Sequence, residues 1–425
     1  MKPLACLWVG VFCIFSSHLY AATYGGGNGT AENPYRITSR ADFLALAADT
    51  ANYDKCFILT ADIDLAGETF TTAVIAPDTD VTDGFQGTPF TGVFDGSGHI
   101  LDHLTIFADG NFTGLFGEVR SGGQIRNLDL NNVDIRNGGY YVGGLVAHLY
   151  DGTLRSCHVS GSVGGMGFVG GLVGSSFFGA IDFCHADCSV TGLSSHVGGL
   201  IGYNYDGTIQ SCYAAGTTYG NGTYVGGLAG RNDSTITSCY ATGAVAGNYY
   251  FVGGLVGANW GLIDSCFATG SVSGMGYIGG LVGGVDYGIH ATTRSCFWDQ
   301  ETSGTSDGVG DIDPDPEGCL GKISAQMKIR STFTDVSWDF VGESANGTAD
   351  VWRMCADSVD YPRLSWEFSS VGDFDCPDGV AMDDLFYLAS RWCATTPETV
   401  GASDANGDGK TDLADLAILA AHWLK

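Results

Sequence analysis

The sequence predicts a mainly β protein, a right-handed, single-stranded parallel β-helix (solenoid) followed by a small α-helical module at the C-terminus. The first observation is a motif of one hydrophobic residue, two glycines and a leucine, spaced by 27, 28, 28, 27 and 26 residues. Such a period indicates one supersecondary unit that must stack on its neighbours to bury its apolar side chains. The second is that residues 120–296 show alternation with a period of two and no helical periodicity. The third is a duplicated loop and amphipathic stripe at the C-terminus, which predicts the helical module. The motif begins at Val142, Val169, Val197, Val225, Val252 and Ile278.

Composition and the N-terminal segment indicate an exported protein. The 425 residues carry a formal net charge of −29, which repels phosphate backbones and anionic lipids and so argues against nucleic acid as a partner. Residues 1–22 combine Lys2, an apolar run over 4–15 and small residues at Ala21 and Ala22, the pattern of a secretory signal peptide. No later stretch has 18 consecutive apolar residues, so we expect no membrane span and a secreted, extracellular or cell-surface location.

Residues 23–110 are expected to form an N-terminal cap and the first coils. Ser39 followed by the apolar residues Phe43, Leu44 and Leu46 predicts a short N-capped amphipathic helix. Such a helix would cover the first coil, because an open sheet edge templates aggregation.

Residues 111–300 are expected to form the repeating coils. A second signature, as in Ile236-x-Ser238-Cys239-x-Ala241, alternates small apolar and larger side chains and therefore predicts a strand whose cysteine points inward. In an exported protein a column of cysteines invites disulfides. However, side chains in one column of parallel strands point the same way, whereas a relaxed disulfide needs a dihedral near 90°. We therefore expect buried free thiols, with Cys188 also packed inward. The predicted column is Cys157, Cys184, Cys212, Cys239, Cys266 and Cys296, and an outward ladder of Tyr213, Tyr240, Phe267 and Phe297 is expected to line one face.

Residues 301–369 lose the repeat and are expected to form a closing cap and a linker. Tryptophans mark this region, at Trp298, Trp338, Trp352 and Trp366. Cys319 and Cys355 could pair there, and the sequence leaves that pairing open.

Residues 370–425 contain a calcium-loop signature. In 404–415 the sequence DANGDGKTDLAD has EF-hand spacing, with oxygen-bearing side chains at alternate positions and Gly409 at the sharp turn. A second copy lies 31 residues upstream, where Pro377 and Asp378 replace Asp408 and Gly409, so the first loop must distort. Cys376 and Cys393 flank this loop and could form a disulfide. The expected ligands of calcium are Asp404, Asn406, Asp408, Lys410 through its carbonyl, Asp412 and Asp415, and in the first loop Asp373, Asp375 and Asp384.

Two known families resemble these patterns. The coil pattern at 252–257 and 265–270, with a lead-in at 90–99, resembles the GLUG repeat of bacterial surface and secreted proteins. This resemblance implies the architecture and says almost nothing about activity. The unit at 370–425 is similar to a type I dockerin, which implies calcium at the ligands given above and docking to a cohesin-like or other surface scaffold protein. Dockerin loops often present Ser-Thr for recognition at the positions that here hold Met382-Asp383 and Leu413-Ala414.

Two classes of function remain open at this point. Asp206 and Asp233 lie one coil apart and could approach the separation used by retaining glycosidases, although solvated turn residues are the favoured interpretation. A lyase surface is disfavoured because no lysine lies between residues 141 and 296. His158 and His185 share an outward column that could bind a metal, but surface packing is favoured. We therefore expect a non-catalytic surface protein that binds glycan or protein; the alternative is an exported carbohydrate-active enzyme (polysaccharide lyase or glycoside hydrolase) with a dockerin-type appendage.

Overall fold

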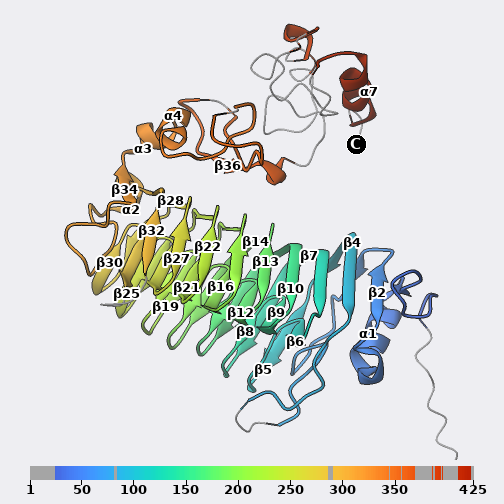
Figure 1. The fold of residues 1–425 in the computed structure, drawn as a ribbon. Coiled ribbons are helices and arrows are strands. Elements are labelled where there is room, and N and C mark those ends of the chain that lie inside the picture. The colour runs from blue at the N-terminus through green and yellow to red at the C-terminus, as the bar shows by residue number, and fades with distance from the viewer. Residues whose placement is uncertain are drawn as a thin grey trace, which may run out of the picture.

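The computed structural model shows the expected parallel β-solenoid (Figure 1). It describes residues 24–80, 84–285, 291–343, 345–355, 357–368, 385, 388–393, 395 and 410–422. The predicted signal peptide at 1–22 and the loop positions 373–384 and 404–408 lie outside the described residues.

Within the described residues, three parallel sheets run along the solenoid axis. Sheet A is the longest, and each coil contributes one to three strands to it. Its strands are β1 (Tyr35–Ile37), β2 (Cys56–Leu59), β3 (Ile63–Asp64), β4 (Val93–Asp102), β5 (Thr105–Ala108), β7 (Gln124–Asn137), β10 (Thr153–Gly165), β13 (Ala180–Asp182), β14 (His185–Gly192), β17 (Thr208–Gln210), β18 (Tyr213–Ala214), β19 (Thr218–Gly220), β22 (Thr235–Thr237), β23 (Tyr240–Ala241), β24 (Val245–Gly247), β27 (Leu262–Asp264), β28 (Phe267–Ala268), β29 (Val272–Ser273), β32 (Thr292–Arg294), β33 (Cys296–Asp299) and β34 (Cys319–Lys322).

Sheets B and C complete each coil. Sheet B consists of β6 (Phe116–Arg120), β9 (Val146–Tyr150), β12 (Val173–Phe177), β16 (Ile201–Tyr205), β21 (Ala229–Asn232), β26 (Val256–Asn259) and β31 (Val282–Val285). Sheet C consists of β8 (Val142–Gly143), β11 (Val169–Gly170), β15 (Val197–Gly198), β20 (Val225–Gly226), β25 (Tyr250–Gly253) and β30 (Gly276–Gly279). The register pairs Val225 with Val252 and Gly226 with Gly253, so one sequence repeat makes one coil.

The glycine pair of the motif is required by close backbone approach. A Cβ on Gly226 would lie 2.1 Å from the carbonyl oxygen of Ala229, and one on Gly227 would lie 2.1 Å from that of Gly254 in the next coil. No side chain fits at either distance. The motif therefore marks the tight corner between sheets C and B.

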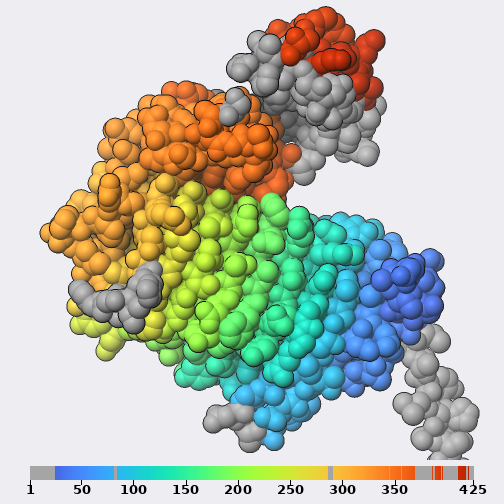
Figure 2. Space-filling model, viewed as in Figure 1, coloured from blue at the N-terminus to red at the C-terminus, as the bar shows by residue number. Residues whose placement is uncertain are grey.

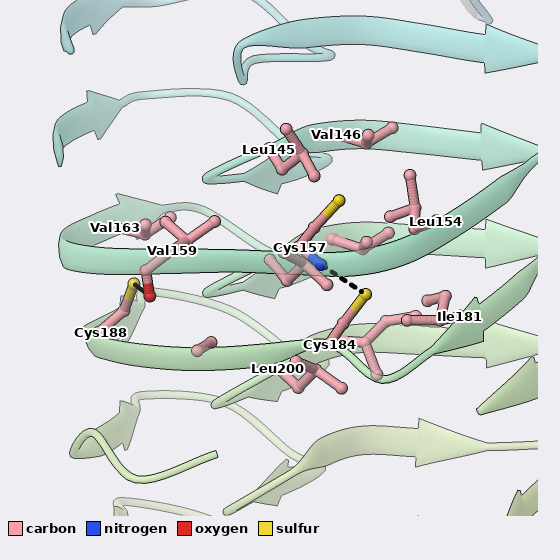
Figure 3. Packing of buried hydrophobic residues seen from close by; sticks show 14 of the residues in the cluster. Leu145, Val146, Leu154, Cys157, Val159, Val163, Ile181, Cys184, Cys188 and Leu200 are labelled. Carbon is pink, nitrogen blue, oxygen red and sulfur yellow. Dashed lines mark hydrogen bonds between the residues drawn. The ribbon is translucent and has the colours of Figure 1, made fainter. Parts of the chain in front are cut away.

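The cysteine column lies inside the solenoid, as predicted (Figure 3). All six cysteines are buried with free thiols, and the backbone N–H of Cys157 donates to Sγ of Cys184 at 3.4 Å. The same contact recurs from Cys184 to Cys212 and from Cys212 to Cys239. Cys188 is also buried, and burial raises the pKa of its thiol to about 12.

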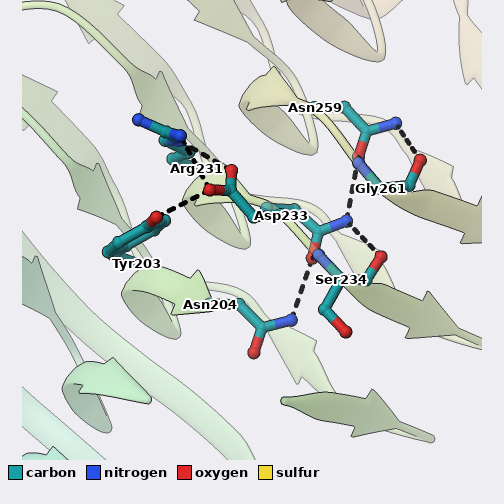
Figure 4. A network of polar contacts seen from close by, with 8 residues as sticks. Tyr203, Asn204, Arg231, Asp233, Ser234, Asn259 and Gly261 are labelled. Carbon is teal, nitrogen blue, oxygen red and sulfur yellow. Dashed lines mark hydrogen bonds and ion pairs between the residues drawn. The ribbon is translucent and has the colours of Figure 1, made fainter. Parts of the chain in front are cut away.

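Buried asparagines form a second column inside the solenoid. Asn204 donates through Nδ2 to Oδ1 of Asn232 at 2.9 Å, and Asn232 donates in the same way to Asn259 at 2.8 Å (Figure 4). These side chains also bond to turn carbonyls such as that of Gly261. The ladder thereby satisfies polar groups at the corner that leads from sheet B to sheet A.

The N-terminal cap has the predicted form. Helix α1 (Arg40–Ala48) begins after Ser39, whose side chain accepts a hydrogen bond from the backbone N–H of Asp42. Phe43 and Leu46 face the first coil and are buried. The short 3₁₀ helix η1 (Thr50–Asn52) follows it.

The region after the repeats departs from prediction. The solenoid continues through β34, which pairs with β33 in register, and Val309 bridges to Val282. Residues 324–368 then fold back along the flank of sheet A instead of closing its end, as the orange segment of Figure 2 shows. We call this segment the flank cover. Among the described residues after the repeats, the fully bounded helices are α2 (Gln300–Ser303), α3 (Ser324–Met327), α4 (Arg330–Thr334), η2 (Ser365–Glu367) and α7 (Leu413–His422), and β35 (Trp352–Arg353) pairs antiparallel with β36 (Arg363–Leu364).

Candidate binding surface

The aromatic ladder predicted on sheet A exists, but it is not an open face. The rings of Tyr213, Tyr240 and Phe267 stack at 4.9 Å between successive centroids. Tyr240, Phe267 and Phe297 are buried, because Trp338 and Trp352 of the flank cover pack against them. The ladder lines one face of the coils as expected, but three of its rings are not open to solvent, because they pack against a segment of the same chain.

Hydrogen bonds fix the flank cover to this ladder. The hydroxyl of Tyr240 donates to the carboxylate of Glu367 at 2.8 Å, and Arg363 pairs with the same carboxylate at 2.6 Å. Trp366 donates through Nε1 to the backbone oxygen of Ser211, and Trp338 donates to that of Ser295. Apolar burial and matched polar contacts together hold the segment on the solenoid.

A second aromatic column, which the sequence analysis missed, lies at the corner before sheet C. From Tyr141 onward, each member directly precedes the hydrophobic residue of the glycine motif, whereas Phe112 precedes the related sequence Thr113-Gly114-Leu115; this position was the signal that could have revealed the column. Centroids of neighbouring rings lie 4.5–5.4 Å apart, close to the rise between coils. The column is Phe112, Tyr141, Phe168, His196, Tyr224, Phe251 and Tyr277.

Most rings in this corner column stack face to face with the rings of the neighbouring coils. Phe112 and Tyr141 are parallel within 2°, and Tyr141 and Phe168 within 7°. A stacked ring shows only its edge to solvent. The column therefore serves mainly the packing of one coil on the next.

Open ring faces lie beside it, on sheet B. Tyr150, Phe178 and Tyr205 are 38%, 49% and 37% exposed, and Phe178 meets the other two rings edge to face at 76° and 82°. Phe177 and Tyr203 flank them. We call these five residues the aromatic patch; they lie on or directly after strands β9, β12 and β16.

Charged side chains at the edge of the aromatic patch form ion pairs with one another. Arg231 makes a bidentate pair with Asp233 at 2.7 Å for both contacts, and Tyr203 donates to Asp233 at 2.6 Å (Figure 4). The guanidinium of Arg231 also lies over the ring of Trp260. Burial and the contact with Asp233 raise the pKa of Tyr203, so it remains a neutral hydroxyl.

The acidic pair considered for catalysis does not form. Sheet B pairs Asn204 with Asn232, which sets Asp233 beside Tyr205 rather than beside Asp206. Asp233 is in addition committed to Arg231 and Tyr203. The two carboxylates thus occupy different slots and different environments.

Only part of the predicted calcium site falls within the described residues. Asp412 precedes helix α7 and accepts from the N–H of Ala414 at 2.8 Å, and Asp415 accepts from the N–H of Asp412 at 2.8 Å. Asp415 is buried, whereas Lys410 is exposed. Both carboxylates therefore accept backbone hydrogen bonds in the first turn of the helix, and their role as calcium ligands stays a prediction.

This fold is a parallel β-solenoid, and four segments of its coils match the GLUG motif. The model of the GLUG motif matches residues 138–164, 193–219, 221–246 and 248–273. Within the part that the structure describes, no helix has the length and apolarity to cross a membrane.

Similar proteins extend the resemblance. Halomucin of Haloquadratum walsbyi is 37% identical over 144 residues, which are 33% of this chain and 2% of halomucin. A protein of Evansella cellulosilytica described as a "putative Gly-rich membrane protein" is 29% identical over 157 residues, 35% of this chain and 17% of its own length. The chain thus spans only a small part of these relatives. A crystal structure described as a "putative immunoglobulin A1 protease" of Bacteroides ovatus shares the fold, with a TM-score of 0.54 at 20% identity over 81% of this chain and 95% of that one.

Proposed function

We propose that this protein is a secreted, non-catalytic surface protein that binds glycan chains on the aromatic patch and is attached to a scaffold by its calcium-binding C-terminal module. The observation that carries the glycan proposal is the set of tilted, exposed rings of Tyr150, Phe178 and Tyr205. The face of an aromatic ring is electronegative and attracts the weakly positive C–H groups of a sugar ring.

The arrangement along the axis supports a chain-like ligand. Tyr150, Phe177 and Tyr205 are register partners in successive coils and form a row parallel to the solenoid axis, and Phe178 directly follows Phe177. Near the row, Asp233 is paired with Arg231 and Glu118 with Arg120, whereas the exposed carboxylates of Asp151 and Asp206 directly follow Tyr150 and Tyr205. This excess of negative charge favours neutral sugars over acidic ones.

The attachment proposal rests on the C-terminal loops. Oxygen donors at alternate positions of the sequence 404–415 fit a hard cation, and Asp412 and Asp415 are two of the proposed ligands. The resemblance to dockerins makes a cohesin-like or other surface scaffold protein the proposed partner. Export to the cell surface agrees with both parts of the proposal.

Affinity electrophoresis of the full chain through soluble neutral and acidic polysaccharides tests the glycan proposal. We expect at least one neutral polysaccharide to retard the protein, and each change of Tyr150, Phe178 or Tyr205 to Ala to weaken binding by roughly two- to tenfold. Tyr249→Ala is the matched control, because Tyr249 is 54% exposed and lies outside the patch. Equal losses in the control and the patch variants, or no retardation by any polysaccharide, would contradict the proposal.

A further inference from the structure

Three potential metal ligands meet on the flank of sheet A, away from the aromatic patch. His158 of β10 and His185 of β14 are direct register partners, and Asp187 lies two residues further along β14. One ligand atom from each lies within 4.8 Å of the others, and Nε2 of His158 is 3.7 Å from Oδ2 of Asp187. Neutral imidazoles and a carboxylate are a ligand set typical of zinc.

Each of the two imidazoles has one buried nitrogen that makes no hydrogen bond. Nε2 of His158 and Nδ1 of His185 are inaccessible to solvent and have no hydrogen-bond partner. The contact of 3.7 Å from His158 to Asp187 is too long for a hydrogen bond. By contrast, His99, His103 and His148 each have a carboxylate oxygen at 3.0 Å. Burying an unpaired polar atom is unfavourable, and a bound cation would satisfy both nitrogens.

Protonation states agree with metal binding. Burial, together with the neighbouring His158, lowers the pKa of His185 to about 3, so its lone pair is available at neutral pH. The contact with His158 lowers the pKa of Asp187, which stays ionised. Neither ligand would need to lose a proton at pH 7 before binding a metal.

We propose that His158, His185 and Asp187 form a binding site for a divalent transition ion of the zinc class. The rings stack with centroids 4.0 Å apart, so binding one ion through both imidazoles requires rotation about χ2, a broad torsion in histidine. Two nitrogen donors select such an ion over calcium, which prefers oxygen ligands.

Two clefts adjoin the three side chains. His185 lines one of about 580 Å³ with Tyr213 and Trp366, and Asp187 lines another of about 440 Å³, so the partly exposed carboxylate of Asp187 is the ligand that solvent reaches. Arg155 and Arg363 also line the first cleft, and Arg363 is paired with Glu367 at 2.6 Å. On the other side, Asp129 of β7 pairs in register with His158 and adds a second carboxylate.

Zinc titration calorimetry on the untagged full chain, saturated with calcium, tests the site. We expect one zinc ion per chain at this site, and His185→Gln and Asp187→Asn each to weaken it by at least about tenfold. His103→Gln is the matched control, because His103 is an exposed histidine elsewhere on the solenoid. Circular dichroism establishes that each variant is folded, and Asp187, whose side chain is 44% exposed, is the change least able to disturb packing.

Cobalt substitution distinguishes this site from the buried thiols. Cobalt bound by nitrogen and oxygen shows ligand-field absorption without a sulfur-to-cobalt charge-transfer band. A sulfur band in the folded protein would assign the metal to the cysteine column and overturn the proposal. So would zinc binding that both variants leave unchanged, or that His103→Gln weakens to the same extent.

Discussion

Each residue of the corner column combines a left-handed backbone conformation with a ring that stacks on a neighbouring coil. The seven residues of the corner column have φ between 50° and 66°, a left-handed conformation that costs a non-glycine residue roughly 1–2 kcal/mol. Stacking with the ring in the next coil contributes about 0.5–1.5 kcal/mol per pair and offsets much of that cost. Aromatic side chains are therefore suited to a corner where glycine would be the easier backbone choice.

The buried side chain of His196 makes the free energy of unfolding depend on pH. Burial and the nearby Arg231 lower its pKa from about 6.5 to about 4, with Asp233 acting in the opposite direction. Below pH 6.5 the unfolded chain binds a proton that the folded chain refuses, so the free energy of unfolding falls as pH falls, down to about pH 4. Urea denaturation at several pH values should show this slope in the wild type and a smaller slope in His196→Tyr, which keeps a ring in the column. An unchanged slope in the variant would show that His196 does not titrate as described.

Gly226 offers a test of the corner geometry. Gly226→Ala places a Cβ 2.1 Å from the oxygen of Ala229, so the corner must open and we expect a loss of at least about 2 kcal/mol in unfolding free energy. Gly110→Ala is the control, since a Cβ there meets nothing within 4 Å. Comparable losses for the two variants in urea denaturation would refute the steric explanation of the motif.

The flank cover is the element that decides which face of the solenoid is open. It buries Tyr240, Phe267 and Phe297 under Trp338 and Trp352, whose own rings lie 4.4 Å apart. A solenoid without this segment would expose a long apolar stripe along a sheet, a feature that promotes association. The cover thus protects sheet A and leaves the rings of sheet B exposed.

Truncating Trp352 should detach the flank cover from sheet A. Trp352→Ala removes a buried ring and should cost about 3–5 kcal/mol of the stability that holds the cover in place. Amide hydrogen exchange should then accelerate in residues 324–368 and remain slow in the coils at 140–280. Tyr249→Ala, at an exposed ring, should change neither region. Slow exchange retained in the cover of Trp352→Ala would show that other contacts suffice.

At the scale of the whole molecule, stability divides between two sources. The solenoid depends on stacked coils and a continuous core, whereas the C-terminal module is proposed to depend on calcium. Ligand linkage makes the module's stability depend on the free ion, by about 2.7 kcal/mol at a concentration 100 times Kd.

Calorimetry with and without a calcium-selective chelator tests this division. We expect one transition, that of the terminal module, to move to lower temperature in chelator, while that of the solenoid stays in place. Asp412→Asn and Asp415→Asn should reduce the shift, and Asp151→Asn, on an exposed turn of the solenoid, should not. A scan in which no transition responds to chelator would rule out the calcium assignment.

The period, the strands, the inward thiols and the capped first coil could all be predicted from the amino-acid sequence. These follow from local spacing, because a side chain's direction in a strand alternates with position and a stacked repeat preserves its column. Which outward column is covered and which rings keep free faces became known from the three-dimensional structure. Tyr240 and Tyr205 are both aromatic residues on outward strand faces, yet a segment more than 80 residues downstream of Tyr240 buries it and leaves Tyr205 open. Likewise, the unpaired nitrogens of His158 and His185 became visible only when the burial and partners of each atom were known. A periodic pattern predicts which residues are neighbours in adjacent coils. It cannot predict contacts with a distant segment that lacks the repeat.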